Sequence, residues 1–338
     1  MNSEFKKYIN YVFHQELDLE KTISAFDLIM NGEVSDIQIS SFLSLLQKSG
    51  IREHHIIGAI SVMKSKMIKI ETNVEAMDTC GTGGDGKNSL NISTAVAFVL
   101  AARGIHIAKH GNRALTSKCG SADVLKSLNI NVDMETTKLR ECIEKIGICF
   151  MFAPNHHPAM KYVGPVRQQL GIQTIFNILG PLLNPANVRK QLVGVYSKEV
   201  FEIYKSVFEK ENDRKFCLIS GFDGNDEISL DGKNLIYTNE NGVFEFDPVS
   251  IDLPRSNIDE ITGGDAKYNA KRILEIFKGK KDSFFHAVCI NSAFGILLND
   301  SLEINEKNIK KALNESIGII SEGSPLKIIN ELSNFTNK

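Results

Sequence analysis

Residues 78–94 read DTCGTGGDGKNSLNIST, which is the strongest local signal in the chain. An apolar run typical of a strand ends here, three glycines follow within four positions, and a helical pattern begins near Asn91. Glycines adopt positive φ angles and let backbone N–H groups approach a ligand, while a helix start adds unpaired N–H groups and a positive dipole end. The stretch therefore predicts a phosphate or pyrophosphate cradle. It matches neither the dinucleotide nor the Walker pattern, and the alternative is a glycine-rich turn that only packs tightly.

A second cluster, KHGNRALTSKCGSAD, begins at Lys109 after the next strand-like run. The carboxyl ends of parallel strands are where open sheets bind ligands. Lys109 offers a point charge, Arg113 offers a planar fork suited to phosphate, and Ser117 and Ser121 add hydroxyls at the next helix start. A solvated basic turn, which is the alternative, would not need Gly111 and the hydroxyl residues around it. The two clusters together favour a phosphate site.

The flanking sequence predicts the fold class. Residues 1–70 carry four apolar stripes at helical spacing, with Asp18 placed to cap the second helix and Ser35 with Gln38 forming a capping-box pattern before the third. From about residue 72, strand-like runs alternate with helical patterns, which is typical of a mostly parallel sheet covered by helices.

An antiparallel hairpin interrupts that alternation at NLIYTNENGVFEF, where Asn241-Gly242 is the signal for a two-residue turn, and residues 267–332 return to helices. The predicted class is α/β, with a small all-helical N-terminal domain and a larger domain whose mostly parallel central sheet is flanked by helices. We expect the small domain to span residues 1–71, joined by helices from about 160–185, and the α/β domain to span 72–338.

The composition excludes several classes of protein. A length of 338 residues is about twice a typical domain of roughly 150 residues, which favours one large or two unequal domains. With 42% hydrophobic and 24% charged residues, the chain is an ordinary globular protein. Its formal net charge of -2 gives no global signal for a polyanion, so any phosphate contact must be local.

Targeting and redox signals point to the cytoplasm. The early acidic residues argue against a signal peptide, and no run reaches the roughly 20 apolar residues of a membrane span. The six cysteines are scattered and form no C-x-x-C pair, so neither a zinc site nor a disulfide framework is indicated. Free thiols in a reducing cytoplasm are expected.

Four stretches together resemble the anthranilate phosphoribosyltransferases of tryptophan biosynthesis, a family with a nucleoside phosphorylase-like fold. They are GTGGDG with NIST, KHGNRALTSKCGSADVL, FAPNHHPAMKYVGPVRQQLGIQTIFNILGPLLNP and FDGNDEISL, in the family's order. The resemblance runs from the N-terminal helices to the last ones. Leu90, Thr116 and Gln173 stand where Phe, Ser and Arg are usual, and the last departure concerns an auxiliary basic contact rather than the reaction.

The resemblance implies a glycosyltransferase of the pentosyltransferase type. It would transfer the 5-phosphoribosyl group of phosphoribosyl diphosphate to the amino group of anthranilate, releasing pyrophosphate. The resemblance also implies Mg²⁺ as cofactor and a homodimer, with no nucleic-acid or membrane partner, and leaves an anthranilate synthase partner open.

The same resemblance assigns the site residues. Those for phosphoribosyl diphosphate are Gly81, Gly84, Asp85, Ser89, Asn91, Ile92, Ser93, Thr94, Lys109, His110, Gly111, Asn112, Arg113, Ala114, Leu115, Thr116, Ser117 and Ser121. Those for anthranilate are Gly81, His110, Asn112 and Arg167, and those for the metal are Ser93, Asp226 and Glu227. No catalytic acid or base is assigned. His110 is a candidate proton relay, and the alternative is that it orients the substrate or fills space.

Two of these roles have a direct physical reason. The guanidinium of Arg167 can pair with the carboxylate of anthranilate. The oxygen ligands of Asp226 and Glu227 suit Mg²⁺, which often binds one or two carboxylates plus substrate phosphates. Because adjacent side chains point to opposite sides of an extended backbone, two metal positions or a water-mediated ligand are expected there. The nucleophile, an aromatic amine, is neutral at pH 7 and needs orientation rather than a strong base.

Three other functions remain open at this point. A pyrimidine nucleoside phosphorylase is disfavoured by the KHGNR cluster and the stretch around Arg167. A non-catalytic nucleic-acid-binding relative of the same fold is disfavoured by the net charge of -2. A structural protein with a vestigial site can be separated from an enzyme only by activity.

Overall fold

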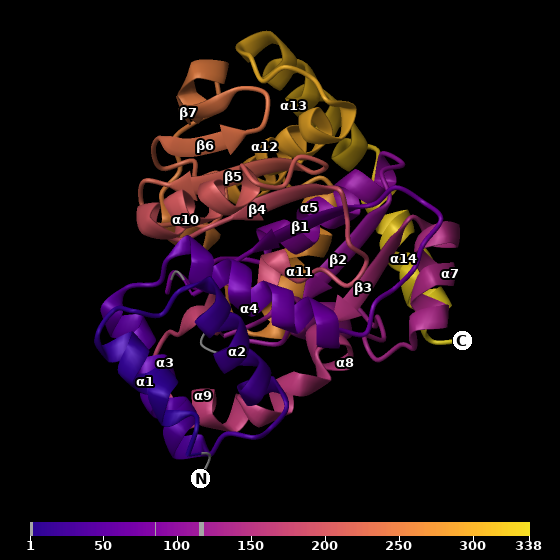
Figure 1. Cartoon of the computed structure of the whole chain (residues 1–338). Helices are drawn as coiled ribbons and strands as arrows, with labels where there is room; N and C mark the ends of the chain where they lie inside the picture. Colours follow the sequence, from indigo (N-terminus) through magenta and orange to yellow (C-terminus); the bar gives the residue numbers. More distant parts are fainter. Residues whose placement is uncertain (1–2, 85, 115–117) are drawn as a thin grey trace. The chain divides into compact units, whose positions relative to one another are not determined.

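The structure is a computed structural model that describes residues 3–84, 86–114 and 118–338 (Figure 1). The chain divides into two compact units, Met1–Lys69 with Ala153–Pro185 and Ile70–Phe152 with Ala186–Lys338. Four residues with predicted site roles, Asp85, Leu115, Thr116 and Ser117, lie outside the described residues.

The first unit is helical. Its long helices are α1 (Lys6–Phe13), α2 (Leu19–Met30), α3 (Asp36–Ser49) and α4 (Glu53–Lys66), and its second segment adds α8 (Ala153–His156), η1 (Pro158–Tyr162), α9 (Gly164–Leu170), η2 (Ile175–Asn177) and η3 (Gly180–Leu182). Buried aromatic rings join the two segments. The ring centroid of Phe26 lies 6.1 Å from that of Phe42 and 5.7 Å from that of Phe176. The Pro- and Gly-rich segment therefore shares a core with the N-terminal helices.

The two predicted helix caps differ in outcome. Asp18 caps α2 as predicted, because its side chain accepts a 2.9 Å hydrogen bond from the Lys21 N–H. The capping box predicted for α3 is wrong. The Ser35 hydroxyl donates to Gln38 Oε1 over 3.1 Å instead of accepting from the backbone.

The second unit contains the sheet. In the described residues its strand order is β3-β2-β1-β4-β5-β6-β7. The strands β1 (Met77–Gly81), β2 (Ile107–Gly111), β3 (Ile148–Phe152), β4 (Lys190–Gly194) and β5 (Lys215–Gly221) are parallel, and β6 (Asn234–Thr238) and β7 (Gly242–Phe246) are antiparallel. From β1 the strands that follow in sequence, β2 and β3, are added on one side of the sheet. From β4 the later strands are added on the other side. The topological switch point therefore lies between β1 and β4, where open α/β sheets bind ligands beyond the carboxyl ends of the strands.

The predicted hairpin is confirmed, but its turn is longer than predicted. Thr238 pairs with Gly242, so the loop covers residues 239–241 rather than Asn241-Gly242. Gly242 opens β7 with a φ of 66°, in the left-handed region that favours glycine.

Helices cover the sheet as the alternating pattern predicted. They are α5 (Ile92–Ala102), α6 (Ser121–Ser127), α7 (Thr136–Ile146), α10 (Lys198–Phe208), α11 (Ala266–Phe277), α12 (Ser283–Asp300), α13 (Glu306–Ser321) and α14 (Ser324–Thr336), with the short turns η4 (Pro248–Ile251) and η5 (Ile258–Ile261). Helices α5 and α12 pack together and are buried over most of their length, which explains why both are apolar on nearly every face. No helix in the described part of the chain is both long enough and apolar enough to cross a membrane.

Candidate active site

Three loops of the second unit leave the carboxyl ends of central strands. The glycine-rich loop follows β1, the loop that begins at Asn112 follows β2, and residues 222–230 follow β5. They come together because the parallel strands end at the same edge of the sheet.

The glycine-rich loop closes tightly on the acidic segment after β5. Gly83 and Gly84 have φ angles of 60° and 77°, a conformation that favours glycine. The Gly83 N–H donates a 2.8 Å hydrogen bond to Asp226 Oδ2, although the two residues are 143 positions apart. A Cβ at Gly81 would overlap the Asp226 carboxylate. The close approach of these two segments therefore requires glycine at the end of β1.

The three predicted metal ligands, Ser93, Asp226 and Glu227, line one small cavity together with Thr79 and Gly194. The backbone at the acidic pair is not extended. Asp226 and Glu227 lie in a bend, so both can face the same cavity.

The donor set of this cavity fits Mg²⁺. The described residues hold no cluster of three or more His, Cys, Asp or Glu side chains that could bind a metal. Two carboxylates and a hydroxyl are nevertheless hard oxygen ligands of the kind that Mg²⁺ prefers. Substrate phosphates commonly supply the other ligands of a Mg²⁺ ion bound in this way. Burial raises the pKa of the Asp226 carboxyl, so a bound cation there would stabilise its charged form.

Lys109 brings a buried positive charge beside the acidic cavity. Its Nζ donates to the carbonyl oxygen of Thr79 and, over 3.3 Å, to Ser93 Oγ. Burial lowers the pKa of this lysine, while the carboxylates of Asp78, Glu227 and Asp226 oppose the shift. The side chain therefore reaches the end of β1 and the start of α5.

The loop after β2 is held by hydrogen bonds between its backbone and two side chains of α6. The N–H groups of Ala114 and Gly120 both donate to Asp123 Oδ2, over 3.1 and 3.0 Å. Ser121 Oγ donates to the Asn112 carbonyl over 3.3 Å. Gly111 and Gly120 leave no space for a Cβ. Sequence reasoning gave Asp123 no role, although its place in the first turn of α6 was a signal for one.

Side chains at the end of β2 and in the loop after it lie in different environments. His110 is buried, and its N–H donates to Asp78 Oδ1 over 3.2 Å. Asn112 and Arg113 are exposed, and the Arg113 guanidinium carbon lies 5.3 Å from the centroid of the Phe152 ring. Asp78, which is fully buried, was not predicted as a site residue.

The first turn of α5 separates its three predicted ligands. Ile92 and Ser93 line the acidic cavity, whereas Thr94 lines a different, mostly apolar cavity with Phe98 and Phe150. Thr94 is 1% exposed, and its hydroxyl has no hydrogen-bond partner among the described residues.

The start of α5 is tied to a segment that sequence reasoning missed. Asn91, the N-cap residue of α5, accepts a 2.8 Å hydrogen bond from Asn269 of α11. Ser89 forms an isolated antiparallel bridge with Thr262. No sequence pattern signalled Asn269.

Arg167, predicted to bind anthranilate, lies on α9 of the first unit. Its guanidinium carbon is 5.5 Å from the centroid of the Phe176 ring, and burial lowers the pKa of the side chain. Among the described residues no carboxylate pairs with it. A half-buried cation without a counter-ion is costly, and an anionic ligand would offset that cost. Gln173, in the same unit, is half-buried.

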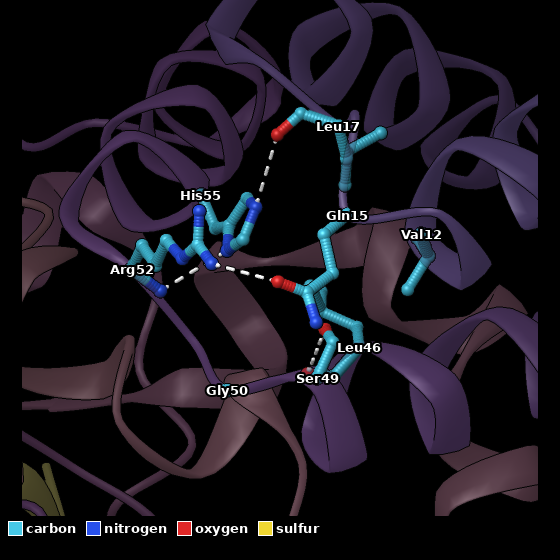
Figure 2. A pocket seen from close by; sticks show the side chains of 8 residues that line it. All are labelled: Val12, Gln15, Leu17, Leu46, Ser49, Gly50, Arg52 and His55. Atoms are coloured by element: carbon cyan, nitrogen blue, oxygen red, sulfur yellow. Dashed lines mark hydrogen bonds between the residues drawn. The ribbon is translucent and has the colours of Figure 1, made fainter.

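Figure 2 shows a separate pocket of the first unit, lined by Val12, Gln15, Leu17, Leu46, Ser49, Gly50, Arg52 and His55. Its polar groups bond to one another. Arg52 donates to Gln15 Oε1 over 3.2 Å and through its N–H to His55 Nδ1 over 3.0 Å. His54 and His55 both reach the Leu17 carbonyl, and burial lowers the pKa of His55 to about 4. No predicted site residue lies here, so we interpret the pocket as a structural junction.

The switch-point loops, the buried lysine and the acidic pair are those of an α/β enzyme suited to a phosphorylated substrate, and the same chain carries a helical unit. Residues 73–323 match the family model described as glycosyl transferase family, a/b domain, and residues 6–67 match its helical bundle domain. The chain belongs to the anthranilate phosphoribosyltransferase family, as its relatives show.

Relatives and solved structures agree on this family. The anthranilate phosphoribosyltransferase of Pelagibacter ubique is 39% identical over 95% of this chain and 96% of its own length. That of Petrotoga mobilis is 40% identical over 98% and 97%. The structure of the Thermus thermophilus enzyme matches with a TM-score of 0.90 and 30% identity, covering 98% of this chain and 99% of that one. The Saccharomyces cerevisiae enzyme, solved in complex with PRPP and Mg, has a TM-score of 0.92 at 24% identity, covers 100% of this chain and 99% of its own, and shares the fold.

Proposed function

We propose that the chain transfers the 5-phosphoribosyl group of phosphoribosyl diphosphate to the amino nitrogen of anthranilate. The products are N-(5-phosphoribosyl)anthranilate and pyrophosphate, a step of tryptophan biosynthesis. One observation carries the proposal: Ser93, Asp226 and Glu227 line a single cavity at the β1/β4 switch point, next to the glycine-rich loop and Lys109.

The second unit would bind phosphoribosyl diphosphate. N–H groups of the glycine-rich loop and the charge of Lys109 would stabilise the negative charge that develops on the departing pyrophosphate. The carboxylates of Asp226 and Glu227, with the Ser93 hydroxyl, would hold Mg²⁺. When bound, this ion supplies positive charge at the diphosphate oxygens. The remaining predicted ligands, from Ser89 to Ser121, would complete the contacts to diphosphate and ribose.

Anthranilate would be bound through its carboxylate by Arg167, whose guanidinium has no other acidic partner among the described residues. Gly81, His110 and Asn112 are the other residues proposed for it. The amine is neutral at pH 7, so its correct orientation, rather than a strong base, would supply much of the rate gain. His110 is the proposed relay for the proton that the amine loses after attack.

An assay with anthranilate, phosphoribosyl diphosphate and Mg²⁺ tests the proposal by following the loss of anthranilate fluorescence. Loss that requires all three components supports the proposal, and no loss overturns it. Phosphorolysis of uridine or thymidine would favour the nucleoside phosphorylase alternative. A gel shift that weakens steeply with salt would favour nucleic-acid binding.

We also propose a cytoplasmic homodimer. All six cysteines are free thiols, as a reducing compartment would keep them. Sedimentation velocity on the purified chain tests the dimer.

A further inference from the structure

Asn269 of α11 is a buried amide with a hydrogen-bond partner at each end. It is 1% exposed. Its Oδ1 accepts from the Gly264 N–H over 2.8 Å, and its Nδ2 donates to Asn91 Oδ1 over 2.8 Å. Asn269 and Asn91 are 178 positions apart, so no local pattern could link them.

These contacts determine which end of each side-chain amide carries the oxygen and which carries the NH₂ group. A backbone N–H can only donate, so Gly264 determines which end of Asn269 carries the oxygen. The other end, Nδ2, must then donate, and Asn91 must present its oxygen to it. The NH₂ group of Asn91 is therefore directed away from Asn269. One of its hydrogens reaches the Cys119 carbonyl over a long 3.5 Å contact.

The same segment also holds the backbone around Asn91. The Leu90 N–H donates to the Ile261 carbonyl over 2.8 Å, and the Gly263 N–H donates to the Asn88 carbonyl over 2.7 Å. A Cβ at Gly263 would overlap the carbonyl oxygens of Asn88 and Ser89. The position of the backbone and the orientation of the Asn91 amide therefore both depend on residues 261–269.

We propose that Asn269 is a positioning residue for the transfer reaction. The chain of bonds from Gly264 through Asn269 to Asn91 turns the NH₂ group of Asn91 toward the oxygen atoms of bound phosphoribosyl diphosphate. The inference rests on the proposed function of Asn91 as a ligand of that substrate. An aspartate at position 269 could not hold Asn91 in this orientation, because its carboxylate oxygen would face the Asn91 Oδ1, and both oxygens are acceptors.

The test variant is Asn269→Asp. The new carboxylate keeps the size of the side chain and still accepts from Gly264, but it presents oxygen to Asn91. The Asn91 amide must then turn and present its own oxygen to the diphosphate. We expect the KM for phosphoribosyl diphosphate to rise about 10-fold or more, because a hydrogen bond to a charged group is lost. The anthranilate KM should change little.

Asn91→Asp is the second variant. It keeps the acceptor for Asn269, removes the outward NH₂ group and adds a negative charge, so the same KM should rise even where Asn269→Asp folds poorly. In an Asn91→Ala background, Asn269→Asp should add no further increase, because the two residues act through one amide.

Gln38→Glu is the matched control, since Gln38 is a buried amide of α3 in the first unit whose Oε1 accepts from the Ser35 hydroxyl, and it has no role in the proposed site. It should lower the Tm and leave the KM for phosphoribosyl diphosphate unchanged. An active wild type with an unchanged KM in Asn269→Asp, or in Asn91→Asp, would overturn this inference alone. A wild type without turnover would overturn the proposed function, and this inference with it.

Discussion

Replacing Arg167 by Met should weaken anthranilate binding without harming the fold. The guanidinium lies 5.5 Å from the Phe176 ring centroid, is half-buried, and pairs with no carboxylate among the described residues. A hydrogen bond to a charged group contributes about 1.5–3 kcal/mol, so the anthranilate KM should rise about 10- to 150-fold. The free energy of unfolding should change by less than about 1 kcal/mol, because the lost cation–π contact is worth about 0.5–1 kcal/mol and a desolvated charge is removed.

The assay is steady-state turnover with anthranilate varied at saturating phosphoribosyl diphosphate and Mg²⁺, together with urea unfolding of the same protein. Arg52→Met is the matched control, since Arg52 is an exposed cation of the same unit that contacts Gln15. It should leave the anthranilate KM unchanged. An unchanged KM in Arg167→Met would refute the role of Arg167. A loss of about 3–5 kcal/mol in unfolding free energy would also refute the reasoning, because it is typical of a broken buried ion pair.

Three further predictions concern the metal site and the pH dependence of stability. Asp226→Asn with Glu227→Gln should weaken the Mg²⁺ dependence of turnover, and metal titration curves that overlay the wild type would show that these carboxylates are not ligands. Gly81→Ala should raise the Mg²⁺ concentration for half-maximal activity, because its Cβ would displace the Asp226 carboxylate; an unaltered midpoint would contradict the required close approach. The pKa of His55 is about 4 in the folded protein against its usual 6.5, so the unfolded state binds its proton first as the pH falls. The free energy of unfolding should therefore decrease as the pH falls from about 6.5 to about 4. Urea unfolding at pH 7 and pH 5 should show a smaller decrease in this free energy for His55→Asn than for the wild type. Equal decreases in the two proteins would contradict this assignment.

The element order could be predicted from the sequence because each element carries its own periodic pattern. The run that ends in the glycine-rich loop forms β1, and the segment capped by Asp18 forms α2. The errors occurred where a local pattern is compatible with two structures. The Asn-Gly signal fits both a two-residue turn and the longer loop observed before Gly242, and Ser35 found a side-chain partner in place of a backbone one.

Contacts between distant segments could not be predicted in the same way. Asp226 carried a family pattern, but nothing in that pattern shows that its carboxylate accepts from Gly83 or that Gly81 must lack a Cβ. Asn269 carried no pattern at all. Its role follows only from the fold, which places α11 against the start of α5.

The first turn of α5 shows why a motif cannot assign ligands residue by residue. With 3.6 residues per turn, successive side chains point about 100° apart, so adjacent hydroxyls cannot face one ligand equally. Ser93 lines the acidic cavity and accepts from Lys109, whereas Thr94 is buried in a different cavity beside Phe98. The two residues are similar in chemistry, and the resemblance gives both a role in binding phosphoribosyl diphosphate, with a metal role for Ser93 as well. Helix geometry separates the two hydroxyls, because only one of two successive side chains can face the cavity beside the glycine-rich loop.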